Sequence, residues 1–395
     1  MWSLEIFNDQ FRGGTPGTIA ADGHRSLIAL MDAVRRTEPA VKTDLAPMPA
    51  PIAVEGVEFI EFAVNETEAE DLKTMLASMG FAHAGRHIAK HVDLYLNGGV
   101  NIVINTEREG FAHSAFLMHG TCVCDIGLKV EDAQATVARA RALGAEPFEQ
   151  PVGPGELKIP AIRGVGGGLM HFVDDKTELA KVWETEFTPV TDQGTPDMGV
   201  THVDHVGQTM NYEELLTWLL FYTTLFDTRK TPMLDVVDPA GLVRSQVIEN
   251  EKGTIRFTLN GADQRSTLAG HFISESFGSS VQHIAFASSD IFRTAEALRA
   301  TGFKFLEISA NYFADLQARF GLADEFVARL KAGNILYDRD GDGEYFQLYS
   351  SLYGDGFFFE IVERRGGYNG YGAPNAQFRI AAQKRSLRDR KIPAR

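Results

Sequence analysis

The stretch HVDHVGQTM, residues 202–210, is a β-type run that places Asp204 and His205 side by side and Gly207 two residues later. Three stretches of the same kind are GVEFIEFAV (56–64), CVCDIGLKV (122–130) and SVQHIAFAS (280–288). Each is followed by a helical pattern and then by short strands with Gly-rich turns. This repeat, with a period of roughly 60 to 80 residues, predicts four βαβββ modules. We expect an α+β fold in which the modules pair into two open β-barrel halves around a cavity.

Length and composition limit the class of protein. The chain has 395 residues, of which 44% are hydrophobic and 10% aromatic, and this predicts packed cores in two or three units. The formal net charge of −15 argues against a nucleic-acid partner and against an anionic membrane. Two cysteines exclude a disulfide framework. No apolar run approaches the roughly 18 residues that a membrane span needs, so we expect a cytoplasmic protein.

The N-terminal region does not read as the start of a domain. SLEIFNDQF (3–11) predicts a buried strand with nothing before it to pair with, and a helix is expected over residues 18–36. PAVKTDLAPMPAPIAV then supplies four prolines, so residues 41–55 are interpreted as a linker. The two halves are expected over 56–190 and 191–395.

Ligand-type side chains recur at matching places in the second half. In an alignment of the first strands of the modules, His205 falls on His283. Glu360 interrupts the apolar run GFFFEIVER, where a buried carboxylate is costly unless a cation pairs with it. Two imidazoles and one carboxylate on one side of a metal form the facial arrangement of non-haem Fe(II) oxygenases. The sequence therefore predicts one Fe(II) site in the second half.

The first half offers different side chains at the same places. Phe59 and Asp125 align with the two histidines, and His171 in GLMHFVDD aligns with Glu360. Because Phe cannot bind a metal, we interpret the first half as structural.

These residues carry a resemblance to a known family. Residues 200–380 resemble the catalytic half of 4-hydroxyphenylpyruvate dioxygenase, in the vicinal oxygen chelate superfamily. The motifs are VDHVG, VQHIAFASSDI, GEYFQLYS, FFFEIVERRGG and GYGAPN, in the order of that family. Residues 56–175 resemble its non-catalytic half more loosely. The resemblance implies that His205, His283 and Glu360 hold Fe(II), that a 2-oxo acid and O2 are the substrates, and that a C-terminal helix caps the site.

The resemblance also implies a substrate pocket. Gln282 and Gln347 would orient the ring of the substrate, and Ser245 and Asn260 its polar end. The departures from the family lie in the same pocket: they are Tyr349 and Tyr371 in place of Phe, Thr267 in place of Gln, and Ala376 and Ile380 in place of aromatic residues. We therefore expect iron chemistry with an altered selection of the aryl group.

A second resemblance concerns residues 1–40. SLEIFNDQF is similar to the last strand of a sugar-phosphate isomerase-like TIM barrel, with Glu5 at a metal-ligand position. Such a barrel is fused to a dioxygenase-like domain in one type of bacterial 3-dehydroshikimate dehydratase. The resemblance implies that the native protein carries an N-terminal barrel, that Glu5 is an orphan ligand, and that these 395 residues alone have no dehydratase activity.

The expected reaction is oxidative decarboxylation of an aryl 2-oxo acid with hydroxylation. Two alternatives stay open: the same iron chemistry on another oxo acid, such as one related to the shikimate pathway, and an accessory domain that binds a metal without turnover. The first half also offers a surface for homo-oligomerisation.

Three further motifs are interpreted as structural. DRDGDGEYF (338–346) resembles a calcium loop, but Tyr349 stands where the bidentate Glu belongs, so we expect a hairpin turn. His83, His87 and His91 are expected to be surface histidines on a strand and turn. RGVGGGL (163–169) precedes no clear helix and is not expected to bind phosphate.

Overall fold

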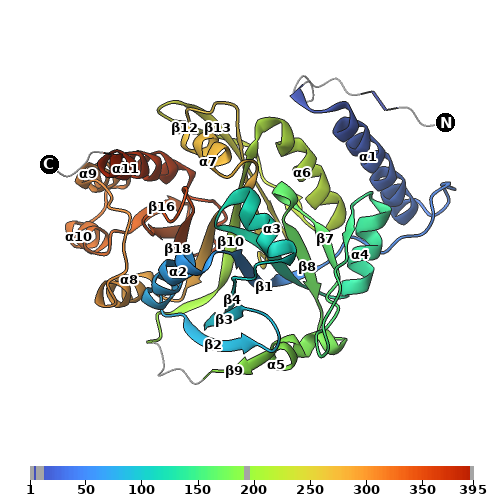
Figure 1. Cartoon of the computed structure of the whole chain (residues 1–395). Coiled ribbons are helices and arrows are strands. Elements are labelled where there is room, and N and C mark those ends of the chain that lie inside the picture. The colour runs from blue at the N-terminus through green and yellow to red at the C-terminus, as the bar shows by residue number, and fades with distance from the viewer. Residues whose placement is uncertain (1–3, 6–12, 191–195, 392–395) are drawn as a thin grey trace.

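The computed structural model describes residues 4–5, 13–190 and 196–391, and these form two large curved sheets (Figure 1). The first sheet has nine strands in the order β6-β7-β8-β5-β1-β4-β3-β2-β9. The second has the order β11-β13-β14-β10-β15-β18-β17-β16, with β12 paired to β13. The strands of the first sheet are β1 Val54–Ala63, β2 Ala82–His87, β3 Val92–Asn97, β4 Val100–Asn105, β5 Cys122–Val130, β6 Pro147–Phe148, β7 Ala161–Arg163, β8 Leu169–Val173 and β9 Phe187–Pro189. Those of the second are β10 Val200–Asn211, β11 Arg229–Lys230, β12 Leu234–Asp238, β13 Gly241–Glu249, β14 Arg256–Ala262, β15 Ser280–Ser288, β16 Leu336–Asp340, β17 Gly343–Tyr349 and β18 Phe358–Arg365.

The two sheets repeat the same topology, which confirms the four βαβββ modules. In each sheet the first strands of two modules pair antiparallel, β1 with β5 and β10 with β15. Each module then closes back parallel onto its own first strand, for example β18 onto β15 and β8 onto β5. The fold is therefore α+β with two open half-barrels, as predicted.

The registers of the paired strands confirm the alignment of the modules residue by residue. His205 lies opposite Ala285 in the second sheet, and Phe59 lies opposite Gly127 in the first. One pleat further on, Gly207 lies opposite His283. Glu61 lies opposite Asp125 at the corresponding place.

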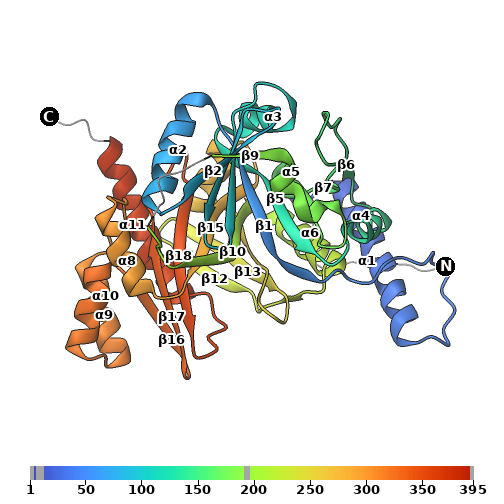
Figure 2. The ribbon, with the colours of Figure 1, turned by 90° about the horizontal axis from the view of Figure 1, so that it is seen from below.

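The helices are of two kinds. The predicted module helices are α2 Glu66–Ser78, α4 Ala133–Ala142, α6 Tyr212–Leu225 and α8 Ile291–Ala300. The side chains of Asn65, Asp132 and Asp290 cap three of them by accepting backbone N–H bonds. The other helices are α3 Gly110–His119, α5 Val182–Glu186, α7 Leu268–Glu275, α9 Ala310–Phe320, α10 Asp324–Gly333 and α11 Ala373–Lys391. Figures 1 and 2 both place α9, α10 and α11 together at one end of the molecule and α1 with α4 at the other.

The N-terminal helix α1 (Pro16–Thr37) is fastened to both halves. Arg25 donates to the carbonyl of Leu143 in the first half, and Thr217 of α6 donates to Asp22. Of the strand expected over 3–11, only Leu4 and Glu5 are described; both are exposed and belong to no strand, so burial is wrong for these two. The rest of that stretch lies outside the described residues.

One hydrophobic core runs through both halves. Phe62 of the first sheet lies 6.1 Å from Phe359 of the second, ring centre to ring centre, and Phe286 stacks on Phe359 at 5.5 Å. Burial of such large rings stabilises the interface between the two halves. A search of the described residues for a helix long and apolar enough to cross a membrane finds none.

The structural interpretation of the minor motifs is largely confirmed. Asp340 and Gly343 end and begin the strands of a hairpin, and residues 163–169 lead into β8 without an α-helix. The surface prediction is wrong for His87, whose side chain is only 4% exposed and bonds Glu186 at 3.2 Å. The carboxylates of Glu156 and Glu186 both lie within 4 Å of its Nε2 atom and pair with it in the interior.

Candidate metal centre

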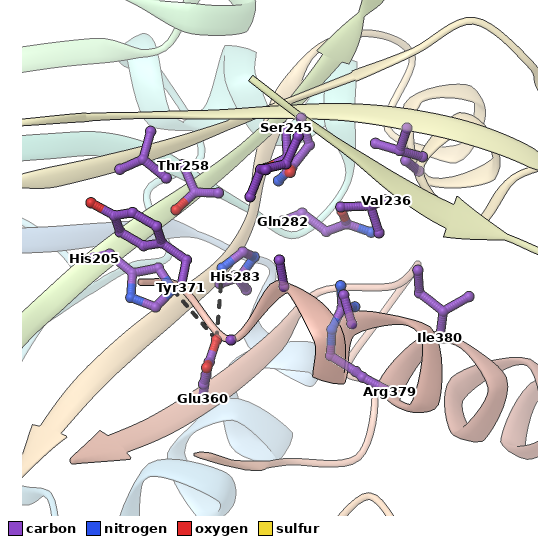
Figure 3. A pocket seen from close by; sticks show the side chains of 18 of the residues that line it. His205, Val236, Ser245, Thr258, Gln282, His283, Glu360, Tyr371, Arg379 and Ile380 are labelled. Carbon is purple, nitrogen blue, oxygen red and sulfur yellow. Dashed lines mark ion pairs between the residues drawn. The ribbon is translucent and has the colours of Figure 1, made fainter. Parts of the chain in front are cut away.

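Three ligand-type side chains meet where strands β10, β15 and β18 lie next to one another (Figure 3). The Nε2 atom of His205 lies 3.4 Å from Oε2 of Glu360, and Nε2 of His283 lies 3.9 Å from the same oxygen. All three residues are buried. Among the described residues, this is the one group of three His, Cys, Asp or Glu side chains whose ligand atoms all lie within 4.8 Å of one another.

The imidazole of His283 packs against the backbone of Gly207, on the neighbouring strand. A Cβ atom at this position would lie 1.9 Å from Cε1 of His283. The absence of a side chain therefore leaves room for the imidazole from the neighbouring strand.

Asp204 holds the imidazole of His205 in one orientation. Nδ1 of His205 donates to Oδ1 of Asp204 at 2.8 Å, so Nε2 is the nitrogen that faces Glu360. Arg364 donates to both oxygens of Asp204, at 2.9 and 3.0 Å, and Arg256 donates at 3.3 Å. Burial alone raises the pKa of Asp204, but Arg364 and His205 outweigh it and hold the pKa well below its usual range.

The pKa values of the two histidines are shifted in opposite directions. Burial lowers the pKa of His205, but hydrogen bonds to Asp204 and Glu360 outweigh it and leave the pKa raised. Burial, with the positive charges of His205 and Arg379, holds the pKa of His283 well below its ordinary value. His283 is therefore neutral at pH 7, which is the form of imidazole that binds a metal.

Gln347 fixes the carboxylate of Glu360. Its Nε2 donates to Oε1 of Glu360 at 2.8 Å and to the hydroxyl of Tyr349 at 2.8 Å. Its Oε1 accepts from Asn375 of helix α11, which in turn accepts from the hydroxyl of Tyr312. Both N–H groups of Gln347 are thus engaged within the protein.

The three side chains lie at a cavity of about 100 Å³ that is partly open to solvent. All six residues predicted for the substrate pocket line it: Ser245, Asn260, Gln282, Gln347, Tyr349 and Tyr371. Ser245 and Asn260 lie opposite each other on β13 and β14. Gln282 accepts a hydrogen bond from Thr209 at 2.6 Å, which leaves its N–H groups for the cavity.

Some pocket residues behave differently from the prediction. The hydroxyl of Tyr371 donates a hydrogen bond to Glu249 at 2.6 Å, so this donor is engaged within the protein. Ala376 and Ile380 line the cavity, but Thr267 does not, because it caps helix α7 by accepting from the N–H of Gly270.

Several lining residues were missed by sequence reasoning, among them Arg379 and Thr258. Arg379 of α11 reaches over the ring of Phe358 at 5.0 Å and brings a cation to the cavity (Figure 3). Thr258 has a buried hydroxyl without a hydrogen-bond partner in the described structure. A basic residue one turn after the GAPN motif was the available signal for Arg379.

The donor set fits a divalent transition metal. The ligand atoms of two imidazoles and one carboxylate lie close to one another. Hydrogen bonds from outside this group orient two of the side chains: Asp204 accepts from His205, and Gln347 donates to Glu360. Sets of this kind bind Fe(II) in oxygenases and Zn(II) in hydrolases.

Comparisons with known proteins agree with this fold and site. Residues 48–188 match the family model described as hydroxyphenylpyruvate dioxygenase, HPPD, N-terminal. Residues 202–343 match the model of the glyoxalase/bleomycin resistance protein/dioxygenase superfamily. The repeated modules and the converging ligands thus define a protein of the vicinal oxygen chelate class.

Relatives place the chain more narrowly. It is 30% identical over 335 residues to a 4-hydroxyphenylpyruvate dioxygenase from a Pseudomonas species, with 82% of this chain and 92% of the relative covered. The chain belongs to the 4-hydroxyphenylpyruvate dioxygenase family. The structure of a variant of 4-hydroxymandelate synthase from Streptomyces coelicolor, 21% identical, has the same fold with a TM-score of 0.71, over 86% of this chain and 100% of that one.

Longer relatives are more similar in sequence. The chain is 40% identical over 390 residues to a 3-dehydroshikimate dehydratase from Pseudomonas putida, and 41% identical over 393 residues to one from Pseudomonas aeruginosa. The alignments cover 97% and 98% of this chain but only 61% and 62% of the relatives, so the chain spans about three fifths of their length. A solved structure entitled xylose isomerase-like TIM barrel/4-hydroxyphenylpyruvate dioxygenase fusion protein has a TM-score of 0.84 at 40% identity, over 97% of this chain and 61% of that one.

Proposed function

We propose that the chain is a non-haem Fe(II)-dependent dioxygenase that decarboxylates an aryl 2-oxo acid oxidatively and hydroxylates it. The observation that carries the proposal is the convergence of His205, His283 and Glu360 at a cavity with unengaged polar side chains. Two imidazoles and a carboxylate would hold a metal that can still bind substrate, as this reaction requires.

The residues divide the work between metal binding and substrate binding. His205, His283 and Glu360 would hold Fe(II), which when bound supplies the redox chemistry and the positions for the 2-oxo acid and O2. Asp204 orients His205, and Gln347 orients Glu360. The polar groups of Ser245, Asn260 and Gln282 are available to hydrogen-bond the substrate, and side chains of α11 form part of the cavity wall.

A second candidate function is supported by the longer relatives. In it, the chain is the dioxygenase-like part of a bifunctional 3-dehydroshikimate dehydratase with an N-terminal TIM barrel, and acts on a different substrate or only binds a metal. The changed pocket side chains, among them Tyr349, Ala376 and Ile380, favour a different substrate. A cytoplasmic location and homo-oligomerisation stay predictions.

Oxygen consumption separates these functions. The Fe(II)-loaded chain is given a panel of 2-oxo acids that includes 4-hydroxyphenylpyruvate, with the Glu360→Gln variant as the control. Uptake with 4-hydroxyphenylpyruvate that is lost in the variant supports the first proposal. Uptake with another aryl 2-oxo acid also supports it, uptake only with a non-aryl oxo acid supports the second, and bound iron without uptake on any member contradicts turnover of these acids.

Replacing Arg379 tests the role of the cation in the cavity. We expect Arg379→Ala to raise the KM for an anionic substrate roughly 10- to 100-fold with little change in kcat, because a charged hydrogen bond contributes about 1.5 to 3 kcal/mol. Steady-state oxygen uptake measures both constants. Arg385→Ala, an exposed arginine on the same helix, is the matched control. An unchanged KM in Arg379→Ala contradicts a contact with the substrate.

A further inference from the structure

The first half contains a cavity of its own at the place that corresponds to the metal centre. Its volume is about 140 Å³, and it opens to solvent. Its floor carries Asp125 and His171, the counterparts of His283 and Glu360. Phe59, the counterpart of His205, also lines it.

Glu61 gives this floor a charge that the second half lacks. It occupies the register position of Gly207 and lies directly opposite Asp125. Its Oε1 accepts from Asn105 at 2.8 Å. Desolvation, and next the charge of Asp125, raise the pKa of Glu61 to about 7. Two carboxyl groups are therefore held next to each other in the lining of the cavity, and burial leaves their repulsion weakly screened.

The protein leaves part of this charge without a partner. Oδ2 of Asp125 is bonded to Nδ1 of His171, but Oδ1 is buried and has no hydrogen-bond partner in the described structure. Asp125 itself is only 3% exposed. An unpaired buried carboxylate oxygen is costly, so its presence in a cavity wall points to a ligand that donates to it.

The other charges around the cavity are paired among themselves. Lys90 donates to Glu156 at 3.0 Å, and His87 bonds Glu186 at 3.2 Å. Lys158, which also lines the cavity, lies 3.5 Å from Glu149, and His171 bonds Asp125. On the floor two carboxyl groups thus face one imidazole, which leaves an excess of negative charge when Glu61 is ionised.

The walls are apolar and largely aromatic. Phe59 and Trp183 stand edge to face at 5.7 Å, and Trp183 packs on Phe187 at 5.5 Å. Val92, Val103, Leu157, Ile159 and Phe148 complete the wall. Aromatic faces next to carboxylates are the chemistry that recognises ammonium groups.

We propose that this cavity is a second ligand site, which binds a small molecule with an apolar body and a protonated amine. The amine donates to Asp125 Oδ1 and Glu61, and the body packs against Phe59 and Trp183. The arrangement does not suit a metal, because Phe59 removes one ligand and Asp125, His171 and Glu61 are not among the residues whose ligand atoms converge. It does not suit a 2-oxo acid, because the carboxylates would repel one.

Calorimetric titration of the full chain with 2-phenylethylamine tests the proposal. 2-Phenylethanol and 3-phenylpropanoate serve as the neutral and anionic probes of similar shape. We expect one molecule of the amine to bind at least about tenfold more tightly than the alcohol, which is a difference of 1.4 kcal/mol, and the acid not to bind to this site. Equal affinity for amine and alcohol, or no binding of the amine, overturns the proposal.

Variants locate the site. Asp125→Asn is expected to lower the affinity for the amine at least about tenfold and to leave the affinity for the alcohol unchanged. If Asp125→Asn does not fold, Glu61→Gln is titrated with the amine in its place, and the same loss of affinity is expected. Glutamine keeps the acceptor for Asn105, so this variant removes the charge and not the hydrogen bond. Glu360→Gln is the matched control in the other half and should bind the amine as the unchanged chain does. Loss of amine binding in Glu360→Gln, with retention in both first-half variants, places the amine at the metal centre and contradicts the inference.

Discussion

Glu360→Gln is expected to abolish both metal binding and oxygen uptake. Glutamine keeps the shape of the side chain and an acceptor for the Nε2 of Gln347, but it removes the negative charge beside His205 and His283. The metal loses its anionic ligand, so its affinity should fall by roughly a hundredfold or more. Oxygen uptake at saturating 2-oxo acid should fall at least about a thousandfold, equivalent to about 4 kcal/mol of transition-state stabilisation.

Glu363→Gln is the matched control for this prediction. Glu363 lies on the same strand, three residues further on, and makes the same kind of buried contact by accepting from the N–H of Ile291. The variant should bind metal, measured by elemental analysis after dialysis, in the same ratio as the unchanged chain. If Glu360→Gln retains one iron per chain and its turnover, this carboxylate is not a ligand.

Strand periodicity made the fold predictable. A β-run with its helix recurs four times, and residues that match between copies occupy matching register positions. For this reason the alignment brought His205, His283 and Glu360 together correctly although they lie on separate strands. The buried charge of Glu360 in an apolar run was the second signal, because such a charge needs a partner.

Other features depend on packing that no repeat encodes. Helices α9 and α10 interrupt the last module, so the module pattern gives no position for them. The engagement of Gln347 depends on Asn375 from α11, which the sequence does not place over β17. His87 was expected on the surface because the carboxylate of Glu186 that buries it lies 99 residues away.

The position of Glu61 beside Asp125 could have been predicted by extending the alignment of the repeats. The same alignment that pairs Phe59 with His205 pairs Glu61 with Gly207, two residues later and on the same face of the strand. Extending it by those two residues would have indicated a charged floor in the first half. The interpretation of that half as purely structural followed from Phe59 alone.

Asp204→Leu is expected to lower both stability and metal affinity, through two separable effects. Leucine is similar in shape to aspartate, but it leaves Arg364 and Arg256, whose side chains are 14% and 13% exposed, without their shared carboxylate. Removing one partner of a buried ion pair costs about 3 to 5 kcal/mol of unfolding free energy. His205 also loses the acceptor of its Nδ1–H, and the loss of such a partner lowers metal affinity roughly 10- to 100-fold.

The double variant Asp204→Leu/Arg364→Met separates the two effects. Methionine removes the charge that the single variant strands in the interior, so the unfolding free energy, measured by chemical denaturation of the metal-free chain, should recover by more than about 1 kcal/mol. Metal affinity, measured by competition with a chelator, should stay low because His205 still lacks its acceptor. A metal affinity that recovers together with stability would mean that Asp204 acts only through the fold, whereas affinity that stays low assigns it to the orientation of His205.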